Sequence, residues 1–348
     1  MTLTACAAPR EPGRGGSAVT VTDQRGRTVS LPGPAQRVVT LPMPAASMLI
    51  CLDRSVQHLA GMHHSSWTAA RESVLGQMFP EVAGIPHEVA DANFAPNVEA
   101  ITALAPDVVV QWGDEGPGIV APLENAGLPV VGLSYGTQED LTTWIGLFGA
   151  LLGNQDRAHA LRSWMDTRLG EVRQAAATAG TRPKIVYFNR FRGGLKVAGG
   201  GTYNDFSIGL VGGANPATAV QGMAGVDVEQ VLAWDPDIVL LGNFDGAVPQ
   251  DVYADPVWAT TSAVRSRRVY KVPLGGYRWD PPGQESPLMW QWLFLLAHPE
   301  AAPSDLRGRI TEDYRFLYGH QPSPAQVDAI LRLDVNGAAP DYRRFDAG

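Results

Sequence analysis

One stretch of the chain occurs twice, and this internal repeat limits the possible folds more than any other feature. Residues 97–110 read NVEAITALAPDVVV, and residues 227–240 read DVEQVLAWDPDIVL, at a constant offset of 130 residues. The identical pairs include Glu99 with Glu229 and Asp107 with Asp237. A match at one fixed offset indicates two similar lobes.

Each copy of the repeat has the pattern of a helix followed by a buried strand. Asn97 or Asp227 can cap a helix, apolar residues follow at helical spacing, and Pro106 or Pro236 ends the helix. The apolar run after each Asp is typical of a strand in a parallel sheet. Further strands are predicted at 38–41, 128–133, 185–188 and 268–272. This alternation predicts two α/β lobes with mostly parallel sheets.

The region between the lobes reads as helical from Glu139 to about residue 179, with a break at Gly153-Asn154. A helix of about 24 residues is about 35 Å long, enough to run along both lobes as a rigid connection. We therefore divide the chain into a lipobox and flexible tether (1–18), an N-terminal α/β lobe (19–137), a helical linker (138–180) and a C-terminal α/β lobe with C-terminal helices (181–348).

Composition excludes several classes of protein. Apolar residues make up 45% of the 348 residues and charged residues 18%, which rules out a disordered chain. The net charge of −8 argues against a nucleic-acid partner, because no basic excess is present to displace counterions. Two cysteines exclude a disulfide scaffold, and no apolar run is long enough to cross a bilayer.

The N-terminal segment Leu3-Thr4-Ala5-Cys6 resembles a bacterial lipobox, in which Cys6 would carry a diacylglycerol that holds the protein on a membrane. The residues up to Ser17 are rich in Pro, Gly and Ala, which suits a tether. The charged and apolar regions of a signal peptide do not precede the motif, so we expect a trimmed sequence or a start codon placed too late. We expect an extracytoplasmic, lipid-anchored protein, with Cys51 a buried free thiol.

Several motifs in order resemble the class III periplasmic substrate-binding proteins of ABC transporters, which carry ferric siderophores, cobalamin or haem. The resemblance covers residues 19–335 and rests on VTDQRGRTV (21–29), NVEAI with LAPD (97–107), GLVGGAN (209–215), DPD (235–237) and HPE (298–300). It implies that a ligand is held between two lobes and handed to a permease dimer. It also implies no catalysis and no cofactor, and we expect a monomer.

In this family, one glutamate on each lobe engages arginines of the permease. The motif places these glutamates at Glu99 and Glu229. The alternative is that each carboxylate only complements the dipole of its helix, which is worth about 0.3–1 kcal/mol. That alternative explains one such residue well, but it does not explain why both lobes keep it in the same register.

Ligands of open α/β sheets bind at the carboxyl ends of the strands, so the loops that follow the strands are the expected site. Arginine offers planar donors to anionic oxygens, and aromatic rings offer stacking area. Such loops suit a large, flat, anionic metal chelate, most simply a ferric siderophore, with cobalamin or haem as alternatives. Some of these side chains could instead belong to the core or the ordinary surface. The expected ligand-binding residues are Met43, His63, His64, Trp67, Trp112, Tyr135, Arg190, Arg192, Tyr203, Phe244, Arg278 and Trp279.

The adjacent His63 and His64 raise the question of a metal held by the protein itself. A closed metal site needs further ligands, and the sequence alone does not place His87 or Glu285 beside them. We therefore expect no bare-metal site. Axial ligation of haem or cobalamin by His63, His64 or Tyr135 stays open.

Two other classes of function compete. Gly132-Leu133-Ser134-Tyr135-Gly136 matches the G-x-S-x-G motif of serine esterases, with Ser134 as nucleophile. No HGGG-type segment precedes it, and the later histidines lie in helical segments, so we expect no enzyme. The third hypothesis is a lipid-anchored surface module that binds a partner protein and no small ligand.

Overall fold

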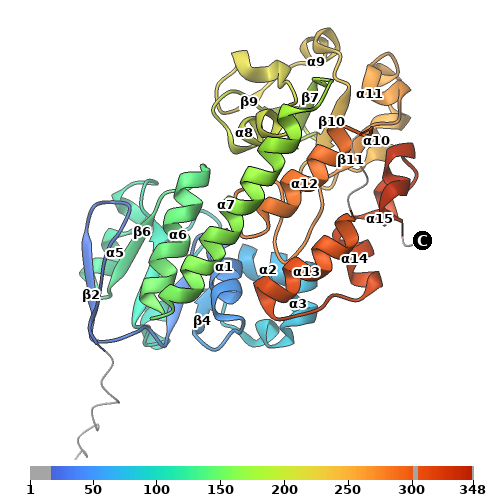
Figure 1. Cartoon of the computed structure of the whole chain (residues 1–348). Coiled ribbons are helices and arrows are strands. Elements are labelled where there is room, and N and C mark those ends of the chain that lie inside the picture. Colours follow the sequence, from blue (N-terminus) through green and yellow to red (C-terminus); the bar gives the residue numbers. More distant parts are fainter. Residues whose placement is uncertain (1–16, 301–304, 347–348) are drawn as a thin grey trace, which may run out of the picture.

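The computed structural model describes residues 17–300 and 305–346. It contains two α/β lobes, each with its own sheet, connected by the long helix α7 (Gln155–Ala177) (Figure 1). This architecture confirms the predicted fold class. Cys6 and the tether before Ser17 lie outside the described residues, so the lipobox remains an expectation.

The first lobe is built on a parallel four-stranded sheet. In spatial order its strands are β4 (Leu59–Met62), β3 (Val38–Thr40), β5 (Val108–Trp112) and β6 (Val130–Leu133). Helices cover both faces, so successive residues of β5 enter different clusters of apolar side chains. Val108 and Val110 pack with residues of α1, whereas Val109 packs with Ile101 of α4. This two-sided burial explains the unbroken apolar runs in the sequence.

The helices of this lobe are short apart from α1. They are α1 (Met43–Asp53), α2 (His64–Glu72), α3 (Val74–Met78), α4 (Val98–Ala103) and α5 (Ala121–Asn125). Within the described residues, no helix is both long enough and apolar enough to span a membrane.

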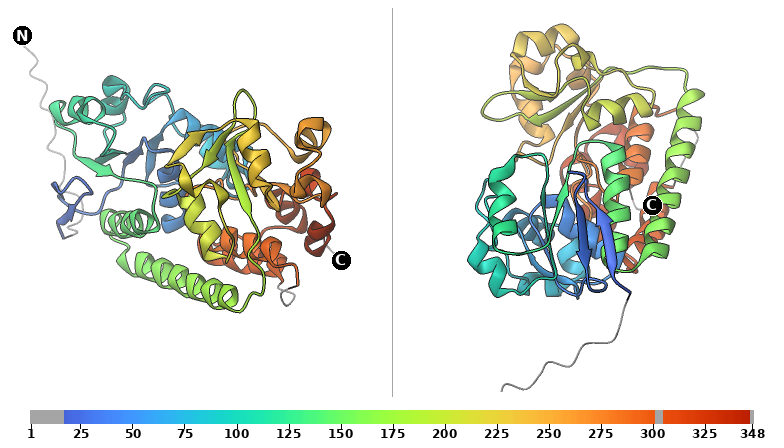
Figure 2. Two further views of the ribbon diagram at one scale, coloured as in Figure 1. Left: turned by 90° about the horizontal axis from the view of Figure 1, so that it is seen from above. Right: turned by 90° about the vertical axis from the view of Figure 1, so that its left-hand side faces the viewer.

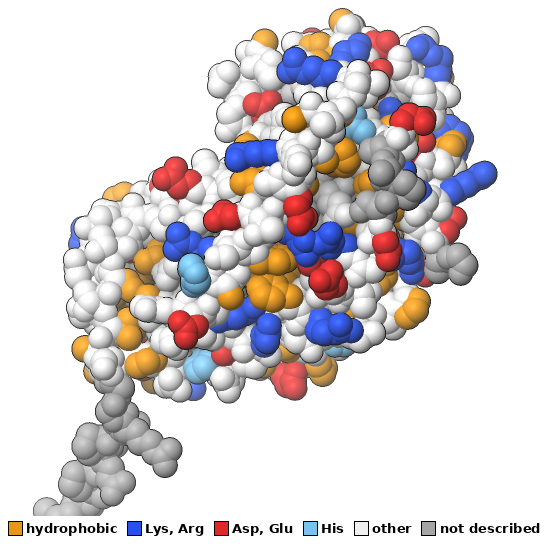
Figure 3. All heavy atoms as spheres, in the orientation of Figure 1, with side chains coloured by type: hydrophobic (Ala, Val, Ile, Leu, Met, Phe, Trp, Pro, Cys, Tyr) orange, Lys and Arg blue, Asp and Glu red, His pale blue; other side chains and the backbone are white. Residues whose placement is uncertain are grey.

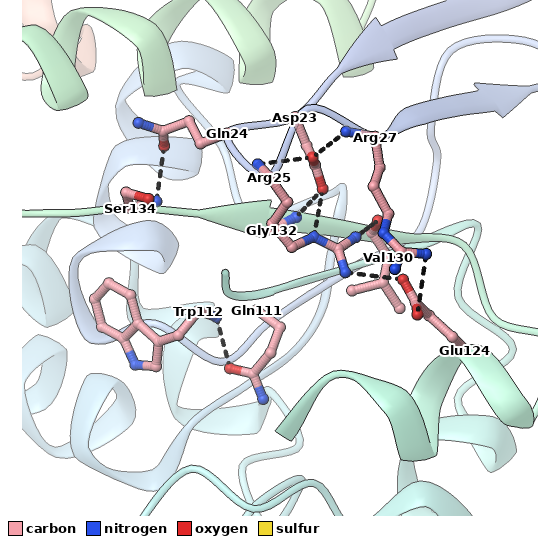
Figure 4. Close-up of polar contacts among 10 residues, drawn as sticks. All are labelled: Asp23, Gln24, Arg25, Arg27, Gln111, Trp112, Glu124, Val130, Gly132 and Ser134. Atoms are coloured by element: carbon pink, nitrogen blue, oxygen red, sulfur yellow. Dashed lines mark hydrogen bonds and ion pairs between the residues drawn. The ribbon is translucent and has the colours of Figure 1, made fainter. Parts of the chain in front are cut away.

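An N-terminal hairpin, β1 (Val19–Thr22) with β2 (Thr28–Leu31), is fastened to the first lobe by its turn (Figure 4). The buried Asp23 carboxylate accepts hydrogen bonds from the backbone N–H groups of Arg27 at 2.9 Å and Gly132 at 2.8 Å. The Arg25 guanidinium bonds to Asp23 at 2.7 Å and to Glu124 at 2.8 Å. A Cβ on Gly132 would clash with the Arg25 side chain, so a larger residue there would displace Arg25 from its ion pairs.

The helical linker is interrupted where the sequence predicts. Helix α6 (Gln138–Leu151) ends before Gly153, which has φ +67°, and α7 begins at Gln155. Figure 2 shows α7 running along the side of the molecule past both lobes. A single helix of 23 residues is stiff, so it restricts how far the lobes can move apart.

The second lobe contains a mixed five-stranded sheet. Its order is β11 (Val269–Lys271), β10 (Ile238–Leu241), β7 (Ile185–Arg190), β8 (Lys196–Ala198) and β9 (Met223–Gly225). The first three strands are parallel, and β8 and β9 are added antiparallel. The lobe's helices are α8 (Tyr203–Leu210), α9 (Val228–Trp234), α10 (Pro249–Ala254) and α11 (Ser262–Arg265).

Four helices complete the described chain, and they contact both lobes. They are α12 (Ser286–Ala297), α13 (Leu306–Tyr318), α14 (Pro324–Ile330) and α15 (Leu333–Asn336). Helix α13 packs on α1 of the first lobe, and α14 packs on α3. The Arg157 guanidinium of α7 joins these elements, because it donates to the carbonyl oxygens of Cys51 at 3.2 Å and Phe316 at 2.8 Å. These four C-terminal helices, the tail helices, therefore pack against the first lobe as well as the second.

Candidate functional site

The carboxyl ends of the two sheets place aromatic side chains of the first lobe opposite loops of the second. Trp112 is the last residue of β5 and Tyr135 follows β6, and their ring centroids are 5.8 Å apart. Trp144 of α6 lies behind both rings, at 6.0 and 5.1 Å. The three rings pack together, with Trp144 fully buried and Trp112 9% exposed, and we call them the first-lobe aromatic cluster.

A hydrogen bond crosses from this cluster to the second lobe. The Tyr135 hydroxyl donates to the carbonyl oxygen of Pro282. Burial raises the pKa of Tyr135 well above its ordinary value, and Tyr277, Tyr203 and Asp280 act in the same direction. Tyr135 is therefore a neutral donor at any physiological pH.

Arg278 supplies a cation on the second-lobe side. Its guanidinium lies 4.9 Å from the ring centroid of Phe244 and 5.9 Å from that of Tyr277. The side chain is half-buried, and no carboxylate of the described residues forms an ion pair with it. Stacking on two rings holds the guanidinium in place without neutralising its charge, so it remains able to bind an anion.

The loop that carries Phe244 is fixed by the buried Asp280. The Asp280 carboxylate accepts hydrogen bonds from the Tyr187 hydroxyl at 2.7 Å, and from the backbone and side-chain nitrogens of Asn243 at 2.9 Å each. Sequence reasoning did not single out Asp280 or Asn243 as supports. The only available signal was their position in loops at strand ends.

Two expected ligand-binding residues are buried in the protein's own interactions. Trp279 is 1% exposed, and its indole N–H donates to Glu285 at 2.6 Å. His63 is also 1% exposed; its Nδ1 accepts from the Ser65 N–H at 3.0 Å and its Nε2 donates to the Asp91 carbonyl at 2.8 Å. Both rings are used within the fold, so we leave them out of the proposed binding surface.

The remaining expected residues are dispersed. Arg192 is exposed and pairs with Asp251 at 2.8 Å, while Arg190 is exposed at the end of β7. Met43 lies at the start of α1 and lines a small cavity with Tyr277. Tyr203 is 5% exposed, and its hydroxyl lies 3.4 Å from Gln138. Their contacts do not join these residues into one contiguous surface.

His64 and Trp67 lie together at another place, the outer edge of the first sheet. His64 begins α2 beside His87 and Glu88, and the Trp67 ring stacks on His87 at 4.0 Å. Glu285, which the sequence raised as a possible ligand here, is buried elsewhere against the Tyr314 and Tyr318 hydroxyls.

The repeat produces the same local structure in each lobe. The Asn97 side chain caps α4 through the Ala100 N–H at 3.1 Å, and Asp227 caps α9 through the Gln230 N–H at 2.8 Å. Ala105 has φ +44° and its counterpart Asp235 has φ +43°. The predicted helix–strand unit is confirmed in both copies.

The equivalence extends to the end of each repeated helix. The Arg37 side chain donates to the Leu104 carbonyl at 2.6 and 2.9 Å, and Lys184 donates to the Trp234 carbonyl at 2.7 Å. Asp107 accepts from backbone N–H groups at 36 and 37, and Asp237 accepts from the backbone at 184. The first turns of α4 and α9 therefore have equivalent places in their lobes.

Glu99 and Glu229 occupy the first turns of α4 and α9, and both are exposed. Among residues 17–300 and 305–346, neither carboxylate forms a hydrogen bond or an ion pair. Two unpaired carboxylates at equivalent positions of two lobes are suited to cationic groups on a second molecule.

One hollow of about 1000 Å³ is not between these loops. It lies between α7 and α12, close to the amino ends of the second-lobe strands, and Arg268 and His298 are among its lining residues. Ligands of parallel sheets bind at the carboxyl ends, so we place the site at Tyr135 and Arg278 instead. On the face drawn in Figure 3, basic and acidic side chains are interspersed, with no continuous basic stripe.

Ser134 does not have the surroundings of a nucleophile. Its backbone N–H donates to Gln24 at 2.9 Å and its carbonyl accepts from Trp144 at 2.7 Å. Within the described part of the chain, no hydrogen bond joins it to a histidine. The G-x-S-x-G match therefore belongs to a structural turn between β6 and α6.

Two lobes, one connecting helix and a repeated acidic turn define a two-lobed binding protein. Residues 67–274 match the periplasmic binding protein family, and the chain belongs to that family. It is a solute-binding protein of the class III kind that serves an ABC transporter, and it is not an enzyme.

Known relatives cover nearly all of the chain. A solved periplasmic solute-binding protein from Veillonella parvula is 32% identical, with a TM-score of 0.84, over 92% of this chain and 99% of that one. The molybdate-binding protein MolA of Haemophilus influenzae is 25% identical over 334 residues, 86% of this chain and 90% of that protein. A cobalamin-binding protein of Halobacterium salinarum is 28% identical over 72% of this chain and 65% of its own length.

Proposed function

We propose that this protein captures an anionic metal chelate, in the first place a ferric siderophore, between its lobes. The observation that carries the proposal is the Arg278 guanidinium, held over the Phe244 ring without a carboxylate partner and close to Tyr135 across the lobes. Trp112 extends the aromatic surface on the first-lobe side. The protein then delivers its ligand to a permease dimer through Glu99 and Glu229.

The chemistry of such a ligand fits these side chains. Catecholate and carboxylate siderophores carry negative oxygens, to which a guanidinium donates two parallel hydrogen bonds. Flat chelating rings stack on Trp and Tyr, and the single proton of the neutral Tyr135 hydroxyl can be donated to a chelate oxygen in place of the Pro282 carbonyl. Cobalamin and haem would use the aromatic surface more than the cation, and they remain alternatives within the same class.

Molybdate is a second candidate, because the MolA relative matches 86% of the chain. Molybdate is a small dianion without aromatic surface. It would use Arg278 and the Tyr135 hydroxyl, but it would gain nothing from Trp112 or Phe244. The response to aromatic substitutions therefore separates the two candidates.

The proposal is tested by calorimetric titration of the ligand-stripped full chain with ferric catecholate, hydroxamate and carboxylate siderophores, cobalamin, haemin and molybdate. We expect saturable binding of one siderophore class and about 10-fold or greater weakening in Arg278→Gln, because a charge-assisted hydrogen bond is lost. Arg173→Gln, an exposed arginine on α7, is the matched control. If only molybdate bound, the protein would be a molybdate receptor and the siderophore proposal would be wrong. If none of these ligands bound, the hypothesis of a surface module that binds a partner protein would be favoured.

The lipid anchor belongs to the same proposal. Cys6 in the lipobox would hold the receptor near its permease on the extracytoplasmic side of the membrane, since a diacylglycerol adds enough buried CH₂ groups for stable attachment. Cys6→Ser in the full precursor should release the protein from the membrane fraction. Retention of this variant on the membrane would contradict the anchor.

A further inference from the structure

Three potential metal ligands lie together at the outer edge of the first sheet. Nδ1 of His64 is 3.2 Å from Oε1 of Glu88, and Nε2 of His87 is 3.5 Å from the same oxygen. One ligand atom from each of the three residues lies within 4.8 Å of the others. None of these side chains takes part in the proposed chelate site or in docking.

The backbone holds these residues together. His64 begins α2 directly after strand β4, and His63 forms an antiparallel bridge with Glu88. The Met62 N–H also donates to the carbonyl of Pro86 at 2.9 Å. The two segments are therefore paired as neighbouring strands, and this pairing fixes the places from which the three side chains extend.

The His87 ring is oriented for a metal. Its Nδ1 lies 3.2 Å from the Ile85 carbonyl, which can only accept, so Nδ1 carries a proton and Nε2 is directed at Glu88, with its lone pair there in the neutral ring. Trp67 stacks on the ring at 4.0 Å with an interplanar angle of 13°. A histidine whose second nitrogen donates to a backbone carbonyl is the usual arrangement in protein metal sites.

A lone pair that faces a carboxylate at 3.5 Å is unfavourable unless a cation or a proton lies between them. In a tetrahedral site with bonds of about 2.0–2.1 Å, neighbouring ligand atoms are about 3.3 Å apart. The two pairs that include Glu88, at 3.2 and 3.5 Å, already match that spacing, and all three ligand atoms lie within 4.8 Å of one another. A small divalent cation could thus join the three ligands with minor side-chain rotation.

We propose that His64, His87 and Glu88 bind a late first-row divalent cation, in the first place Zn²⁺. Two imidazoles and one carboxylate favour such ions over Mg²⁺ and Ca²⁺, which prefer oxygen ligands. Three protein ligands leave a fourth coordination position for water or for an added donor. The argument for this site does not depend on the proposed function.

Calorimetric titration with ZnCl₂ tests the site on tag-free full chain stripped with a chelator. We expect one equivalent of Zn²⁺ to bind, and a weak or absent response to CaCl₂. His64→Ala and Glu88→Gln should each weaken Zn²⁺ binding at least about 10-fold, since each removes one of three ligands. His159→Ala, an exposed histidine on α7, is the matched control and should bind as the wild type does.

A second measurement uses Trp67 as a reporter. Ni²⁺ is a paramagnetic quencher of the same coordination class, so its binding beside His87 should quench part of the tryptophan fluorescence. Trp67→Phe should abolish that part while Zn²⁺ still binds. The site is overturned if wild type binds no Zn²⁺, or if binding persists unchanged in both His64→Ala and Glu88→Gln. Loss of siderophore binding in Arg278→Gln would leave this result unaffected.

Discussion

The Tyr135 hydroxyl of the first lobe donates a hydrogen bond to the Pro282 carbonyl of the second lobe. This contact lies at the carboxyl ends of both sheets, where the ligand is expected. Since α7 and the tail helices brace the lobes, we expect them to restrict opening and closing of this region to a small hinge motion. In the proposed site, Tyr135 would contact the ligand as well as the second lobe, so it is the residue where ligand binding and lobe contact would be coupled.

Tyr135→Phe should lower the free energy of unfolding of the ligand-free protein by about 1 kcal/mol, because a buried hydrogen bond is lost while the ring is kept. Urea unfolding followed by circular dichroism measures this change. Tyr253→Phe removes a hydroxyl within the second lobe and serves as a comparison. An unchanged free energy in Tyr135→Phe would mean that the contact does not hold the lobes together.

Replacing both docking glutamates should stop uptake without affecting the ligand site. In Glu99→Ala/Glu229→Ala, we expect ligand affinity equal to wild type and transport by the reconstituted permease reduced to background. Each single variant should retain part of the activity, because one lobe still docks.

Glu139→Ala is the matched control for docking, since Glu139 is also an exposed first-turn glutamate, but on α6. It loses the same helix-dipole interaction and should transport normally. Loss of ligand affinity in the double variant would show that the two glutamates are misassigned. If Glu139→Ala lost as much transport as the double variant, the loss would be explained by the missing helix-dipole interaction and not by docking.

Asp23 should make the free energy of unfolding depend on pH in the acidic range. Burial alone would raise the pKa of this carboxyl, but hydrogen bonds from the Gly132 and Arg27 backbone and from Arg25 lower it below 3.8. The unfolded chain then binds more protons than the folded one at low pH, so stability is fully present above about pH 4 and is lost as pH falls further.

Asp23→Asn should cost about 3 kcal/mol at pH 7, because the Arg25 charge loses its buried partner. Its unfolding free energy should also fall less steeply than that of wild type between pH 4 and pH 2, a window set by the ordinary Asp pKa of about 3.9. Chemical unfolding at several pH values measures both effects. Asp156→Asn, on the exposed start of α7, should match wild type.

Cys51 should be unreactive in the folded protein. It is completely buried in α1, and burial raises its pKa to about 12, so almost no thiolate exists at pH 8. In a Cys6→Ser background, a thiol reagent should label Cys51 only after denaturation. Rapid labelling of the native protein would indicate local opening of α1 against α13.

The lobes could be predicted from the sequence because the signals for them are local. The cap at Asn97, the stop at Pro106 and the apolar run after Asp107 all lie within one short segment, and the second copy repeats them. The fold class and the repeated helix–strand unit are accordingly confirmed, and the division of the chain into lobes and linker stays a prediction.

The site was harder to predict, because the direction of a side chain depends on distant partners. Trp279 is buried because Glu285 accepts its N–H and is itself held by the hydroxyls of α13. The cluster of His64 with His87 and Glu88 likewise depends on pairing between two segments, which spacing along the chain does not reveal.

The most direct test of ligand capture between the lobes is the tryptophan emission of ligand-stripped protein during titration with the siderophore that binds in calorimetry. Wild type should show saturable quenching, and Trp112→Phe should lose a large part of it while binding at similar affinity. Tyr135→Phe and Arg278→Gln should shift the midpoint to higher ligand concentration. Quenching that is identical in wild type and in all three variants would contradict a ligand site between the lobes.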